Sequence, residues 1–116
     1  MRFKVIVGDD VYAVEVPGDA VQHGGDYFAM LDRDMNRGWQ MSREYVAQPD
    51  RLQRCQIAAD RLLTSIVNNT GATATMLAAY IVARTPGVIG VDVDTTGEMH
   101  NTRLLYAEHA ADEANR

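Results

Sequence analysis

The sequence predicts one two-layer α+β domain over residues 1–100, with segments in the order β-β-α-α-α-β. Two observations indicate strands at its ends, because apolar residues alternate over residues 2–16 and again over residues 88–94. A third indicates helices between them, since apolar residues recur at helical spacing from residue 27 to residue 84. The prediction is an N-terminal hairpin and one C-terminal strand packed against three helices.

The first 16 residues have the pattern of a β-hairpin. Six apolar residues share one face of it: Phe3, Val5, Val7, Tyr12, Val14 and Val16. A two-residue turn at positions 9–10 and one at positions 8–9 give different registers, and both keep the apolar set on one face. Glycine at the first turn position favours the second register, which pairs Val5 with Tyr12.

A first helix is expected from Tyr27 to about Ala47, after a loop over residues 17–25 and with Asp26 as its N-cap. Six residues form its apolar arc: Tyr27, Leu31, Met35, Trp39, Tyr45 and Val46. Gly38 lies in this arc, and a glycine within a helix costs about 1 kcal/mol. It therefore indicates either a close helix crossing or a break.

Two further helices are expected. Pro49 suits the first position of the second helix, which runs to Val67 and ends with Gly71 beyond its C-cap. The third, from about Thr73 to Arg84, is apolar on every side. A helix without a polar face is a buried one, so we expect it to form the centre of the core.

The C-terminal strand is expected to join the hairpin, because a lone strand would leave its backbone groups without partners. Residues 101–116 are polar, alanine-rich and acidic. For this tail the sequence predicts either disorder or a frayed helix around residues 103–111.

Composition argues against several classes of function. A net charge of −5 argues against nucleic-acid binding. No apolar run reaches the roughly 20 residues that a transmembrane helix needs, and the start does not resemble a signal peptide, so we expect a cytoplasmic protein that binds no membrane. Cys55, the single cysteine, excludes an intrachain disulfide and is expected to fill the core. Without nucleotide-binding or zinc-protease motifs, we expect no cofactor, no metal and no catalytic residue.

The sharpest local pattern is D-V-D-T-T-G-E-M-H, from Asp92 to His100. Its D-x-D-x-T resembles the phosphatase motif of the haloacid dehalogenase superfamily, whose large fold needs more than the 20 residues that follow Thr96, so we expect no phosphatase. The acidic positions also fit the start of a calcium loop, but Arg103 stands where a bidentate glutamate belongs. A solvated turn is the simpler interpretation, and adventitious divalent-ion binding stays open.

Asp34 lies at the border of the first helix's apolar arc, where a carboxylate needs a partner. An ion pair with Arg54 or Arg61 of the next helix is the structural explanation. The alternative is a ligand-binding carboxylate in a pocket between sheet and helices. Such a pocket, in a small-ligand-binding regulator or minor enzyme, would be lined by Tyr27, Asp34, Trp39, Arg43 and Tyr80.

The first hypothesis for function is a non-enzymatic interaction or accessory protein that acts as an oligomer, with itself or another protein as partner. Aromatic residues, methionine and arginine are enriched at interfaces. The first helix carries more apolar side chains than one neighbour can cover, and Ile57 is expected to project away from its own helix's apolar face. The predicted interface therefore comprises Met30, Met41, Tyr45 and Ile57.

Overall fold

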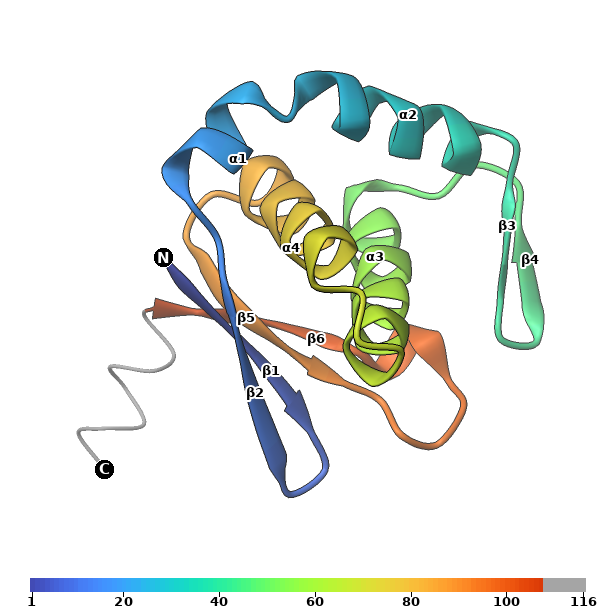
Figure 1. The fold of residues 1–116 in the computed structure, drawn as a ribbon. Helices are drawn as coiled ribbons and strands as arrows, with labels where there is room; N and C mark the ends of the chain where they lie inside the picture. Colours follow the sequence, from blue (N-terminus) through green and yellow to red (C-terminus); the bar gives the residue numbers. More distant parts are fainter. Residues whose placement is uncertain (108–116) are drawn as a thin grey trace.

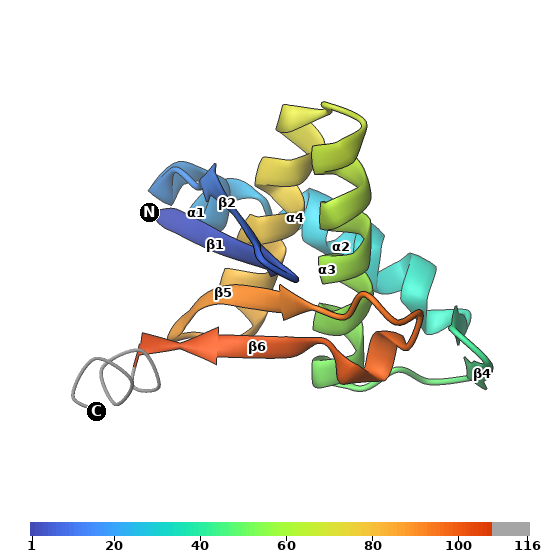
Figure 2. The ribbon, with the colours of Figure 1, turned by 90° about the horizontal axis from the view of Figure 1, so that it is seen from below.

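A four-stranded sheet carries the fold, in a computed structural model that describes residues 1–107. Its strand order is β2-β1-β5-β6, and the helices lie on one side of it (Figure 1; Figure 2). The elements are β1 (Arg2–Val7), β2 (Asp10–Glu15), α1 (Gly18–His23), α2 (Gly25–Asn36), β3 (Trp39–Met41), β4 (Glu44–Val46), α3 (Arg51–Val67), α4 (Gly71–Arg84), β5 (Val88–Val93), the 3₁₀ helix η1 (Met99–Asn101) and β6 (Arg103–Tyr106). The α+β class is confirmed, and the structure contains further short elements, namely α1, β3, β4, η1 and β6, that the predicted order lacks.

The N-terminal hairpin has the register that glycine favours. Val5 pairs with Tyr12, and the turn consists of Gly8 and Asp9. Gly8 has φ +60°, a conformation that glycine adopts at little cost. The C-terminal strand joins this hairpin as predicted, because β5 runs parallel to β1 with Val91 beside Val5.

Helix α4 is the centre of the core, as its all-round apolar sequence predicted. Leu77, Tyr80 and Ile81 have no exposed surface. The helix packs along α3 and lies between the sheet and the two N-terminal helices (Figure 1). Ala78 and Ala79, which lie on the other sides of the helix, are also fully buried, and this burial all round the helix explains why no polar face was needed.

The prediction of one helix from Tyr27 to Ala47 is wrong. Helix α2 ends at Asn36, and Gly38 has φ +91°, which breaks the helix. The small hairpin β3–β4 follows, and its Tyr45 hydroxyl donates a hydrogen bond to the Arg37 carbonyl at 2.9 Å. A Cβ on Gly38 would collide with the Tyr45 ring, so glycine is needed here for packing as well as for its dihedral angle.

Several helix boundaries in the structure also differ from the predicted ones. Residues Gly18–His23, expected within a loop, form α1. Asp50 rather than a first-turn proline begins α3, because its side chain accepts from the Gln53 N–H while Gln53 caps the Asp50 N–H in return. At the end of α3, Asn69 takes the left-handed conformation with φ +58°, and Gly71 already belongs to α4.

The expectation of a polar tail from residue 101 is wrong for β6. Arg103–Tyr106 pair antiparallel with β5, so the sheet extends past the expected boundary at residue 100. The frayed helix expected around 103–111 is therefore contradicted over its first four residues, and 108–111 lie outside the described residues. Within residues 1–107, no helix is both long and apolar enough to span a bilayer.

Candidate functional site

A polar cluster centred on Asp32 joins helices α2, α3 and α4. Its carboxylate accepts hydrogen bonds from the Tyr80 hydroxyl at 2.6 Å, from Arg84 at 2.7 Å and from Arg54 at 3.2 Å. The Asp32 side chain is 26% exposed, so these bonds replace much of its hydration. Arg84 also lies over the rings of Phe28 and Tyr80, with its guanidinium carbon 5.7 Å and 5.2 Å from their centroids.

The electrostatics of this cluster favour one fixed protonation state. Burial raises the pKa of Asp32, but the three hydrogen bonds that it accepts outweigh burial and hold the pKa below its ordinary value. Burial, and then the bond to Asp32, raise the pKa of Tyr80. An ionised aspartate with three donors has little capacity left as a base, so the cluster is built to hold the helices together.

This cluster corrects the prediction for Asp34. Asp34 is exposed, and the carboxylate that pairs with Arg54 is Asp32, two residues earlier on α2. The predicted type of contact, an inter-helix ion pair with the second long helix, is present. The helical pattern favours Asp34 only if residues 39–46 continue the apolar arc of α2, and in the structure these residues belong to the β3–β4 hairpin.

The five residues predicted to bind a ligand do not come together at one cavity. Tyr80 is buried in the Asp32 cluster, and Arg43 lies exposed at the β3–β4 turn. Trp39 is half-buried below the Arg61 guanidinium, 6.0 Å from its ring centroid. Tyr27 is half-buried on α2.

The four residues predicted to form an interface divide into two groups. Met30 and Tyr45 are 38% and 60% exposed. Met41 and Ile57 are 0% and 1% exposed, so the prediction that Ile57 projects away from the core is wrong. Because Ile57 lies on the side of α3 that faces its neighbours, the buried surface of that helix is wider than the arc drawn from the sequence.

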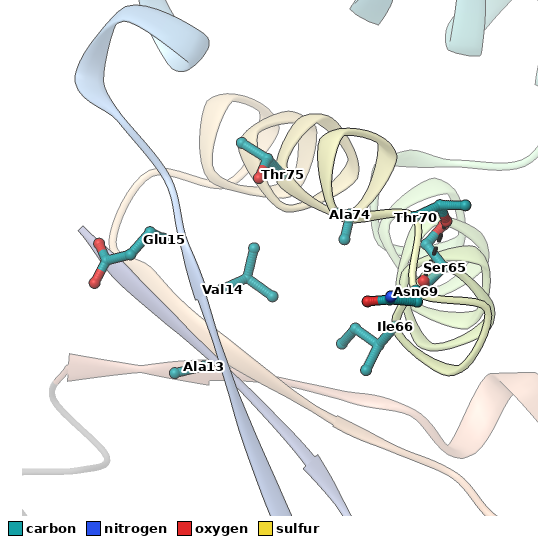
Figure 3. A pocket seen from close by; sticks show the side chains of 10 residues that line it. Ala13, Val14, Glu15, Ser65, Ile66, Asn69, Thr70, Ala74 and Thr75 are labelled. Atoms are coloured by element: carbon teal, nitrogen blue, oxygen red, sulfur yellow. Dashed lines mark hydrogen bonds between the residues drawn. The ribbon is translucent and has the colours of Figure 1, made fainter.

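A cavity of about 310 Å³ lies between the sheet and the helices, at the β2 edge. Figure 3 shows Val14 of β2 pointing across it toward Ile66 and Ala74, whereas Ala13 and Glu15 point to the other side of the strand. Ser65 lines the cavity, and only 7% of its surface is exposed. Its hydroxyl makes no hydrogen bond to another described residue. None of the five predicted ligand-binding residues lines this cavity.

A second cavity of about 400 Å³ adjoins the same strand. It is lined by Arg2, Lys4, Val11, Tyr12 and Ala13. Two cationic residues and no acidic one face it. Residues of β2 line both cavities, so one cavity lies on the helix side of this strand and the other on its opposite side.

The outer edge of β2 has free backbone groups. Met1 and Val16 exchange two backbone hydrogen bonds, at 2.7 Å and 3.0 Å. Since hydrogen-bonded pairs alternate along an antiparallel ladder, the N–H and C=O groups of Val11, Ala13 and Glu15 point away from β1. No hydrogen bond joins these outward groups to any other part of residues 1–107.

The Asp92–His100 stretch comprises the end of β5, a turn whose hydrogen bonds centre on Asp94, and the start of η1. Asp94 accepts hydrogen bonds from the N–H groups of Thr96 and Glu98 and from the Thr96 hydroxyl; the Glu98 N–H contributes most to lowering its pKa. Asp92 pairs with Arg103 at 2.8 Å. Among the described residues, no group of three His, Cys, Asp or Glu side chains could hold a metal ion.

His100 and Cys55 each lie beside one polar side chain. Nε2 of His100 lies 3.0 Å from Glu44, at an angle that does not make a hydrogen bond. Cys55 is fully buried with its sulfur 3.5 Å from the Thr85 hydroxyl, and burial raises the pKa of its thiol. A buried thiol with a raised pKa is a poor nucleophile.

Comparisons of the chain with family models, with curated proteins and with solved structures found no match.

Proposed function

We propose that this chain is a non-enzymatic protein-interaction protein that acts as an oligomer. The observation that carries the proposal is the unprotected edge of β2. Natural sheets usually blunt such an edge with proline, lysine, a bulge or a covering element, because unpaired backbone groups recruit other strands. Strand β2 contains neither proline nor lysine, and its six residues pair with β1 without a register shift.

The side chains on this edge support the same proposal. Val11 is 62% exposed and Tyr12 is 39% exposed. Tyrosine contributes strongly to binding energy at interfaces, because it brings a large rigid surface and a hydroxyl. An edge with free hydrogen-bonding groups and exposed apolar side chains is suited to take up a further strand.

Molecular mass in solution tests this proposal. Light scattering after gel filtration, repeated over a hundredfold range of concentration, should give a mass above that of one 12.8 kDa chain, falling toward it on dilution. A monomer at every concentration would contradict oligomerisation.

The second candidate is a small-ligand-binding regulator or minor enzyme. The cavity of about 310 Å³ between sheet and helices favours it, because ligand sites are concave and mostly apolar with a few polar groups, and the Ser65 hydroxyl would offer one such group. A thermal-shift screen with metabolites and metal ions separates the candidates. A melting temperature that rises with ligand concentration supports this one, and no shift with any compound argues against it.

A further inference from the structure

We propose that two copies of the chain join edge to edge through β2, antiparallel, so that their sheets become one continuous sheet. This inference rests on the proposed oligomerisation and specifies its surface. It differs from the interface that the sequence predicted, of which Met41 and Ile57 are buried.

The free backbone groups select one register. A two-fold axis at Ala13 pairs Ala13 with its own copy, and Val11 with Glu15 of the second copy. All three outward-facing residues of each strand are then in hydrogen-bonded pairs. A shift by two residues in either direction leaves one of the three without a partner.

On the helix side of the sheet, this register brings an exposed aromatic ring to a cavity. Tyr12 shares a face with Val14, since β-strand side chains alternate. In the paired strands, Tyr12 of the second copy lies beside Val14, which is a wall of the cavity of about 310 Å³. Its ring would cover Ile66 and Ala74, and its hydroxyl would offer a partner to Ser65 (Figure 3).

On the other side of the sheet, the register gives charge complementarity. Glu15 of the second copy lies opposite Val11, beside the cavity lined by Arg2 and Lys4. Lys4 forms no ion pair within residues 1–107. The Glu15 side chain is 69% exposed and pairs with Arg2 of its own copy at 3.5 Å; in the dimer it would turn from this exposed pair across the small Ala13 toward that ammonium group. Each copy therefore supplies an aromatic ring to one cavity of the other and a carboxylate to the second.

The test uses two substitutions on the edge. Ala13→Pro removes the central outward N–H and leaves the ladder with β1 intact, because proline is tolerated on an edge strand where its nitrogen faces outward. Tyr12→Ala removes the ring and keeps the backbone. We expect Ala13→Pro to be a folded monomer, and Tyr12→Ala to raise the dimer dissociation constant about thirtyfold, as loss of a tyrosine central to an interface does.

Two matched controls address other surfaces. Met30→Glu alters the exposed side of α2, and Leu52→Glu alters the exposed first turn of α3; both should leave the dissociation constant unchanged. Sedimentation equilibrium gives the mass, and circular dichroism verifies that each variant is folded. If Ala13→Pro does not fold, the dissociation constant of Tyr12→Ala alone decides whether β2 forms the interface.

The outcomes separate the two proposals. The β2 edge is supported if the wild type is a dimer, if both edge variants dimerise more weakly, and if both control variants keep the wild-type dissociation constant. A dimer that persists in the folded edge variants, or one that Met30→Glu or Leu52→Glu disrupts instead, overturns the β2 inference while self-association stands. A monomeric wild type overturns both proposals.

Discussion

Removal of the Asp32 carboxylate is the sharpest test of how the helices are held together. In Asp32→Ala the Tyr80 hydroxyl, on a residue with no exposed surface, loses its 2.6 Å partner. Arg84 loses its 2.7 Å ion pair, and Arg54 keeps bonds to the Pro49 carbonyl and to Asn36. The substitution therefore costs each of the three donors a different amount of stabilisation.

The magnitude follows from burial. A buried hydroxyl left without a partner costs about 1–3 kcal/mol. Arg84 is 36% exposed and regains water, so its lost ion pair is discounted to about 1 kcal/mol or less. Arg54, with two remaining partners, contributes little. We expect Asp32→Ala to lower the free energy of unfolding by about 1–4 kcal/mol.

Urea denaturation at neutral pH measures this loss, and Asp34→Ala is the matched control. Asp34 lies on the same helix but is exposed, so its substitution should change the unfolding free energy by less than about 0.5 kcal/mol. Equal effects of the two substitutions, or a loss below about 0.5 kcal/mol for Asp32→Ala, would refute the assigned role of the cluster.

The same variant has a defined pH dependence. The folded-state pKa of Asp32 is held below its ordinary value of 3.8, so its stabilising contribution is complete above that value and is lost as pH falls through the lowered one. The stability difference between wild type and Asp32→Ala should therefore be constant near neutrality and shrink below about pH 4. A difference that grows on acidification would contradict the sign.

Three further predictions concern the core, the thiol and the Asp92 turn. Leu77→Ala and Ile81→Ala should each cost about 2–5 kcal/mol in chemical denaturation, and losses below 0.5 kcal/mol at both would mean that α4 is exposed. Cys55 should react slowly with a thiol reagent in the native protein and completely in denaturant; rapid native labelling would show that it is accessible. We expect no magnesium-dependent hydrolysis of generic phosphomonoesters, because Asp92 is paired with Arg103; turnover that Asp92→Asn abolishes would overturn this expectation.

Elements with a strong local signal were predictable from the sequence. Alternation placed β1, β2 and β5, and glycine at position 8 selected the observed hairpin register. The apolar run from Met76 to Ala83 identified α4 as the core helix. In each case the side-chain period of one element reports directly which of its faces is buried.

Short elements had no such signal. Strands β3 and β4 have three residues each, too few to show alternation, and Trp39 and Tyr45 coincide with a helical arc. Strand β6 contributes consecutive apolar residues, Leu104 to Tyr106, without alternation. Its strand conformation comes from pairing with β5, a contact that no local pattern records.

The α+β class, the core helix and the joining of residues 88–94 to the N-terminal hairpin could be predicted from the residues alone. Two features became visible only in the folded chain: the carboxylate that meets Arg54 is Asp32 rather than Asp34, and β2 is left as an open edge beside two cavities. The difference lies in the range of the interactions. Periodicity describes geometry within one element, whereas an ion pair between helices and the free edge of a sheet depend on where distant elements pack.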